Sequence, residues 1–215
     1  MARQAPSADV VGEGECLKPF SVAALDLHDH GLTPIPLGGE DGKTPRVKTA
    51  SMTRRPSRAT LRKWAEQYPT ANVGILTGLS SITVIDIDDQ KLVPAMLERF
   101  GATPLQIGTP SGGVHLYYQS ARERSCSLRN EDLAVDVKGL GGMVVVPPSV
   151  RPTGPYTGRQ YRFLHGDWAD LPNLPTLRPG SLSMAATSGR VVSLARVGRG
   201  RRNKSLFRYL LRQVR

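Results

Sequence analysis

The stretch from Ser81 to Asp89 reads SITVIDIDD, and it decides how the rest of the chain is interpreted. Both faces of the extended chain carry apolar side chains, from Ile82, Val84, Ile85 and Ile87, which is typical of a strand buried inside a layered α/β domain. Because side chains alternate along a strand, Asp86 and Asp88 project from one face and Asp89 from the other. The sequence therefore predicts two carboxylates held close together where an apolar strand ends.

Two neighbouring carboxylates repel and raise each other's pKa unless a cation lies between them. Hard divalent ions such as Mg²⁺ and Mn²⁺ favour carboxylate oxygens and keep coordination positions open for substrate phosphates. The pair Asp86 and Asp88 is thus either a metal site or the solvent-exposed end of an ordinary strand.

The composition indicates a globular protein with 215 residues, of which 39% are hydrophobic. No apolar run approaches the length of a membrane helix and no signal peptide opens the chain, so we expect a cytoplasmic protein without a membrane partner. Cys16 and Cys126 are far apart and lack neighbours at zinc spacing, which excludes a disulfide framework and a zinc finger.

The net charge of +11 is concentrated near the end of the chain, because residues 181–215 contain nine Lys or Arg and no acid. Such a tail attracts a polyanion such as nucleic acid, although basic tails are also common as solvated segments. We expect a flexible segment at 1–18, a folded domain at 19–179 that contains the acidic strand, a basic linker at 180–202 and the start of a helical module at 203–215. The chain is expected to continue beyond Arg215.

Hydrophobic periodicity and Gly or Pro punctuation predict alternating helices and strands. The strand at 72–76 is expected to form a β-hairpin with the acidic strand, and a glycine turn at 139–142 joins the next two strands. Residues 38–56 are expected to be a long loop with Lys43 near its centre. Helices are expected over 21–31, 57–68 and 91–100, and strands over 32–37, 72–76, 81–89, 105–108, 114–119, 133–138, 143–146 and 156–163.

A second group of polar residues follows the acidic strand. Adjacent glycines at 112 and 113 allow backbone N–H groups to approach an anion, and His115 lies just beyond them. Further on, Asp136 interrupts an apolar strand and shares a face with Lys138. Alone, the histidine is as well explained as a bystander, and the acid and lysine as an ordinary ion pair.

Taken in order, these segments resemble the primase-polymerase domain of the archaeo-eukaryotic primase superfamily, found in phage and plasmid replication proteins. The segments that carry the resemblance are GLTPIPL, GKTP, NVGILTG, VIDIDD, SGGVH and VDVKGLGGMVVVPPS. It implies an α/β (α+β) fold, in which an RRM-like catalytic subdomain and a smaller α/β subdomain enclose the active site.

By this resemblance, Asp86, Asp88 and Asp136 are catalytic acids that bind Mg²⁺ or Mn²⁺. His115 is implied to contact the triphosphate of the incoming nucleotide. The remaining residues that the family places around the triphosphate correspond to Ser111, Gly112, Gly113, Lys138 and, less closely, Lys43.

The implied activity is template-dependent nucleotidyl transfer, as primase and DNA polymerase, in the cytoplasm of a bacterial or phage-infected cell. The implied partners are a single-stranded DNA template with its primer, nucleoside triphosphates, and a helicase domain or other replisome component. Basic side chains around Arg54–Lys63 and Arg122–Arg129 are expected to track the template backbone. Two alternatives remain: a non-catalytic origin-binding module, and a metal-dependent nucleotide-sugar transferase, whose DxD motif also chelates metal.

Overall fold

The apolar segments that flank the acidic strand fold into two separate antiparallel sheets, seen in a computed structural model that describes residues 18–120 and 122–182. The predicted α+β class is confirmed. The smaller sheet has four strands. Their order is β2 (Thr44–Pro45), β1 (Pro34–Gly38), β3 (Asn72–Leu76) and β9 (Met143–Val145).

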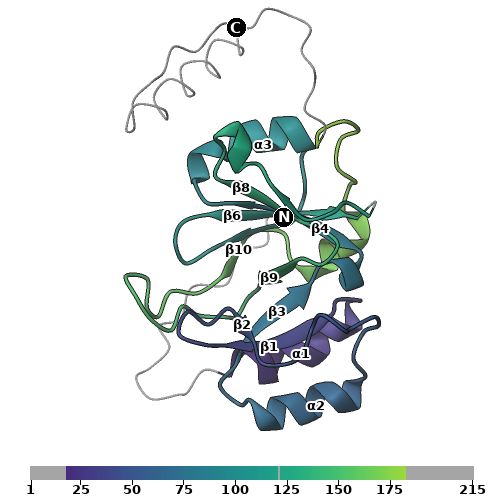
Figure 1. Ribbon diagram of the computed structural model, residues 1–215, viewed down its shortest axis with the longest axis vertical. Helices are drawn as coiled ribbons and strands as arrows, with labels where there is room; N and C mark the ends of the chain where they lie inside the picture. Colours follow the sequence, from purple (N-terminus) through teal and green to yellow (C-terminus); the bar gives the residue numbers. More distant parts are fainter. Residues whose placement is uncertain (1–17, 121, 183–215) are drawn as a thin grey trace, which may run out of the picture.

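Two helices pack on the four-stranded sheet, at the end of the molecule opposite α3 (Figure 1). Helix α1 (Pro19–Asp29) begins at a proline, which suits the first turn because it needs no N–H donor there. Helix α2 (Arg58–Gln67) is capped by Ser57, whose hydroxyl accepts a hydrogen bond from the Thr60 amide. The apolar side chains Leu27 and Leu61 are fully buried.

The larger sheet has six strands and contains the acidic strand near its middle. Helix α3 (Val93–Phe100) covers one face of it, where Ile85 and Ile87 pack with Met96 and Phe100. The strand order is β10 (Arg162–His165), β5 (Gln106–Gly108), β6 (Val114–Gln119), β4 (Ile82–Ile87), β8 (Val135–Lys138) and β7 (Cys126–Ser127).

The opposite face of the six-stranded sheet is turned toward the four-stranded sheet. Val84 and Tyr117 on this face belong to the same buried cluster as Ile35 and Val73 of the smaller sheet, so the two sheets share a core. Side-chain alternation then places Asp86 on the face between the sheets.

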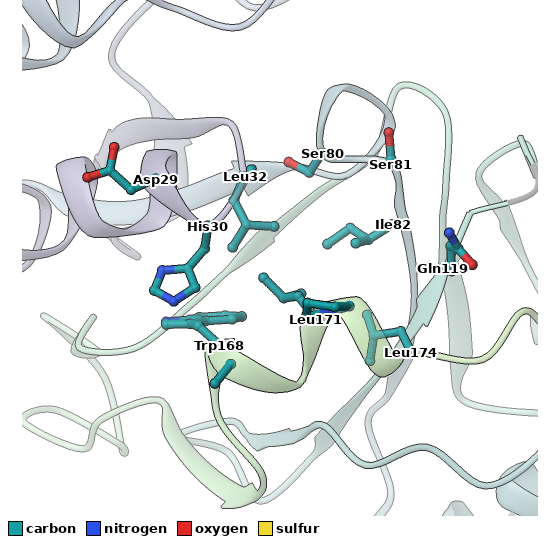
Figure 2. A pocket seen from close by; sticks show the side chains of 13 residues that line it. Asp29, His30, Leu32, Ser80, Ser81, Ile82, Gln119, Trp168, Leu171 and Leu174 are labelled. Atoms are coloured by element: carbon teal, nitrogen blue, oxygen red, sulfur yellow. The ribbon is translucent and has the colours of Figure 1, made fainter.

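Short 3₁₀ turns follow several strands: η1 (Gly78–Ser80), η2 (Gln90–Leu92), η3 (Arg129–Glu131) and η4 (Trp168–Asn173). A cavity of about 580 Å³ lies where η4 meets the end of α1 and the start of β4. Figure 2 shows His30 beside the Trp168 indole, with Leu171 and Ile82 also lining this cavity. Asp86 lies near the other end of β4, so this cavity is separate from the predicted site. Within the described ranges, no helix has the length and apolar content to cross a membrane.

The predicted hairpin between 72–76 and the acidic strand is wrong, because β3 and β4 lie in different sheets. The chain also changes sheet between β8 and β9, so the predicted glycine turn does not close a hairpin either. The two segments that lead from one sheet to the other are hydrogen-bonded to each other. The Thr77 hydroxyl donates to the Gly139 carbonyl at 2.6 Å, and the Thr77 amide donates to the Gly142 carbonyl at 3.1 Å. These long-range hydrogen bonds leave no local signal in the sequence.

The last predicted strand, 156–163, lies too early in the chain. Gly154 and Gly158 both have positive φ and hold a turn through Tyr156, so β10 begins only at Arg162. The sequence also did not predict the two-residue strands β2 and β7 or the turn η4. The expected flexible segment, apart from Lys18, and the helical start at 203–215 lie outside the described residues, as does the linker beyond Leu182.

Candidate active site

Three of the predicted site residues form one row across adjacent strands. On β4, Asp86 is paired with His115 of β6 on one side and with Asp136 of β8 on the other. Side chains directly opposite in an antiparallel pair have Cβ atoms roughly 4.5–5.5 Å apart. The strand order β6-β4-β8 therefore assembles residues that are up to 50 positions apart in sequence.

Each of the two strand acids has a basic side chain beside it. The His115 Nε2 atom lies 3.4 Å from Asp86 Oδ1, and the Lys138 ammonium lies 3.0 Å from Asp136 Oδ2. The His115 side chain is almost fully buried, whereas each acid side chain is 25% exposed. The acids are thus partly desolvated but still open to a ligand from solvent.

Asp88 lies one residue beyond β4 and is held there by its backbone, since its amide donates to the Ala134 carbonyl at 2.9 Å. Its carboxylate Oδ2 is 2.5 Å from Nη2 of Arg129, a residue of η3. The Arg129 Nε atom also lies 3.8 Å from Asp136 Oδ1. Arg129 therefore links the third acid to the row on the strands.

The electrostatic balance keeps both strand acids ionised. Burial raises the pKa of Asp86, but His115, Lys138 and Lys43 outweigh it, so the pKa lies below its ordinary value. Burial likewise raises the pKa of Asp136, and the Ser127 hydroxyl with neighbouring basic side chains outweighs it and lowers the pKa.

Lys43 joins the site from the other sheet. It lies between β1 and β2, and its charge is close enough to contribute to the lowered pKa of Asp86. The loop at residues 38–56, expected to be without regular structure, contains β2 directly after Lys43. Both sheets thus contribute charged groups to the space around Asp86.

The glycine loop, residues 109–113, forms a tight turn between β5 and β6. The Gly112 amide donates to the Thr109 carbonyl at 3.0 Å, and the Gly113 amide donates to the Thr109 hydroxyl at 3.0 Å. The exposed Ser111 hydroxyl lies 3.1 Å from the same Thr109 hydroxyl. A Cβ atom on Gly113 would lie 2.5 Å from the carbonyl oxygen of Ile87. Gly113 thus lets the loop pack against the end of the acidic strand, and both glycine amides are bonded inside the loop.

Sequence reasoning missed two residues near the acids. Arg129 was grouped with the template-tracking arginines, because no local pattern distinguishes it from them. Tyr161 was assigned to a strand, but its ring lies 6.1 Å from the His115 ring, and burial with the nearby Asp86 charge raises its pKa. Among the described residues, the buried His115 Nδ1 and Tyr117 hydroxyl have no hydrogen-bond partner.

The donor set suits a hard divalent cation, because three carboxylates face one region and two of them have lowered pKa values. Within the described part of the chain, however, no group of three His, Cys, Asp or Glu side chains stands close enough to hold a metal ion. Basic side chains lie between the acids instead, and Arg129 and Lys138 supply the positive charge that the carboxylates require.

A protein family matches most of the chain. No curated protein matches the chain. Residues 24–177, more than half of the chain, match the family described as Bifunctional DNA primase/polymerase, N-terminal. The matched range contains all of the residues discussed above, and the chain belongs to this Prim-Pol family of DNA primase/polymerase nucleotidyltransferases.

Proposed function

We propose that the row formed by His115, Asp86 and Asp136, together with Asp88, is the centre of template-dependent nucleotidyl transfer. The observation that supports this proposal most strongly is the register of β6, β4 and β8, which aligns a histidine and two ionised acids across three adjacent strands. Membership of the Prim-Pol family supports DNA and nucleotides as the substrates.

In the proposed reaction, a primer 3′-hydroxyl attacks the α-phosphate of a nucleoside triphosphate. The new O–P bond forms, the bond between the α-phosphate and the bridging oxygen breaks, pyrophosphate leaves and the hydroxyl proton passes to solvent. Enzymes of this family generally depend on a divalent metal. When bound, Mg²⁺ or Mn²⁺ supplies positive charge that lowers the pKa of the attacking hydroxyl and stabilises the leaving oxygen.

The residues that would hold the metal are Asp86, Asp88 and Asp136. Their carboxylate oxygens are hard ligands, and two of the three lie on paired strands, which fix the separation of the Cβ atoms and leave the carboxyl groups able to rotate toward a shared ion. A rigid scaffold of this kind favours catalysis, because it holds charged groups in place before the substrate arrives.

Three basic side chains would hold the triphosphate. Lys138 lies beside Asp136, His115 beside Asp86, and Lys43 approaches from the smaller sheet. Phosphoryl transfer depends on positioning and on neutralising phosphate charge, which these groups provide from two sides of the site. The exposed Ser111 hydroxyl is available as a further donor, whereas the two glycine amides mainly shape their loop.

The experiment is incorporation of a labelled nucleotide on a primed template with Mg²⁺ or Mn²⁺. The double variant Asp86→Ala, Asp88→Ala should lose incorporation and keep DNA binding. The matched control is Asp89→Ala, which removes the neighbouring carboxylate that caps η2 rather than facing the site; it should retain incorporation.

The alternatives give different results in the same assay. A non-catalytic origin-binding module would bind DNA without incorporation in the unmodified protein. A nucleotide-sugar transferase would consume nucleotide-sugar without a template. Incorporation that survives the double variant would refute the assignment of the acids.

A further inference from the structure

Arg129 occupies the position between two acids of the proposed site. Its Nη2 atom lies 2.5 Å from Asp88 Oδ2 and its Nε atom lies 3.8 Å from Asp136 Oδ1. The Asp86 charge is also near enough to favour the charged guanidinium. One side chain thus interacts electrostatically with all three acids.

The backbone on both sides of Arg129 is anchored. Before it, β7 pairs with β8 so that Ser127 lies opposite Asp136, and Leu128 is buried. After it, Glu131 accepts two hydrogen bonds from the Arg99 guanidinium of α3, at 2.6 and 3.2 Å. Both partners of this ion pair are about one-fifth exposed. The fold therefore directs the Arg129 side chain to the acids.

The guanidinium itself is free to leave. The Arg129 and Asp88 side chains are each 57% exposed, so rotation of the long arginine side chain into solvent breaks no buried contact. Exposed ion pairs of this kind contribute little to stability. The anchored backbone and the exposed side chain together permit movement of the charge without movement of the strand.

Arg129 and a divalent cation compete for the same groups. A metal held by Asp88 and Asp136 would lie beside carboxylate oxygens that now face the guanidinium, and two cations at that separation repel. Binding of one therefore weakens binding of the other.

We propose that Arg129 is an exchangeable counter-cation of the acid cluster, which divalent metal displaces and which then pairs with the phosphates of the incoming nucleotide. The inference rests on the proposed function of the acids. A guanidinium suits the second role because it forms bidentate hydrogen bonds with phosphate oxygens. Metal and nucleotide then bind cooperatively, since the nucleotide gives the displaced charge a new partner.

The test is direct Mn²⁺ titration by electron paramagnetic resonance, with and without a non-hydrolysable deoxynucleoside triphosphate. Without nucleotide, Arg129→Gln should bind Mn²⁺ roughly two- to five-fold more tightly than the unmodified protein, the range that loss of an exposed ion pair supports. With nucleotide this advantage should vanish or reverse. Arg129→Lys keeps the charge but not the bidentate geometry, and should recover the weaker Mn²⁺ affinity without the full cooperativity.

The matched control is Arg178→Gln, which removes one exposed guanidinium that donates to the Glu98 carbonyl at the end of α3. It should leave Mn²⁺ affinity unchanged. Equal Mn²⁺ affinity in Arg129→Gln and the unmodified protein would overturn the inference, as would an equal gain in the Arg178 control. Mn²⁺ binding that does not weaken in Asp86→Asn, Asp88→Asn would instead refute the proposed site itself.

Discussion

Replacing Gly113 by alanine tests how the glycine loop supports the acids. The added Cβ atom would lie 2.5 Å from the Ile87 carbonyl oxygen, 3.1 Å from the Thr109 hydroxyl and 3.4 Å from Asp88 Cα. Real Cβ atoms essentially never approach closer than 3.0 Å, so the Ile87 peptide or the loop must move by at least half an ångström. Because that peptide leads directly into Asp88, its movement displaces the acid, whereas movement of the loop shifts the start of β6, which carries His115.

Overpacking of this kind costs about 1–3 kcal/mol. For a domain of this size, 1 kcal/mol corresponds to about 2–4 °C in Tm, so we expect Tm to fall by roughly 2–12 °C. Misplacement of a catalytic group by about 1 Å can cost about a hundredfold in rate, and a half-ångström shift should lower incorporation about tenfold.

The assay combines three measurements: thermal unfolding, Mn²⁺ titration, and incorporation of a labelled nucleotide at a temperature well below Tm. Gly31→Ala is the control, because Gly31 has φ +86 and open space around its Cβ position. It should destabilise by about 1–2 kcal/mol through backbone strain and leave Mn²⁺ binding and incorporation unchanged. A Gly113→Ala protein with unaltered Tm and Mn²⁺ affinity would refute the packing argument.

Replacing His115 by alanine should lower kcat/KM for the nucleotide at least about tenfold and leave the Kd for template within about twofold; unchanged nucleotide kinetics with lost template affinity would reverse the assignment. The lowered pKa of Asp86 means that its charged form stabilises the fold above the unfolded-state pKa of about 4, and that this contribution is lost as pH falls through the lower folded-state pKa. In metal-free buffer, the Asp86→Asn variant should therefore lose less stability than the unmodified protein between about pH 6 and about pH 2. Parallel curves of unfolding free energy against pH for the two proteins would contradict this. Removal of residues 183–215 should preserve extension at low salt and flatten the log K against log salt slope by about 0.7 per lost phosphate contact, whereas an unchanged slope would show that the tail does not bind DNA. This truncation keeps Ser181, whose carbonyl accepts a hydrogen bond from Arg99 at 2.8 Å, and Leu182, which packs against the core.

The local sequence pattern was sufficient to predict the strands that carry Asp86 and Asp136. The apolar stretches that contain Asp86 and Asp136 form β4 and β8, and the α+β class is confirmed. Helix α3 ends at Phe100 as the following glycine predicts, because Gly101 has φ +104. These features depend on residues close together in the chain.

Sheet membership was not predictable in the same way. The segment between β3 and β4 has residues typical of a hairpin turn. Thr77 in this segment, however, donates hydrogen bonds to the Gly139 and Gly142 carbonyls, more than 60 positions away, where the chain passes from one sheet to the other. The position of Arg129 depends likewise on the Arg99 and Glu131 ion pair, which connects η3 to α3. Such contacts are set by tertiary packing and have no signature in a short window of sequence.

In the proposed function, Asp86, Asp88 and Asp136 together hold the catalytic metal. The most direct measurement is anomalous diffraction from crystals grown with Mn²⁺ and a non-hydrolysable deoxynucleoside triphosphate. We expect one Mn²⁺ ion, or two about 3.5–4 Å apart, bound by oxygens of all three carboxylates, with the triphosphate beside His115 and Lys138. Mn²⁺ found away from these carboxylates, with the Arg129 and Asp88 ion pair intact and nucleotide bound, would contradict the account.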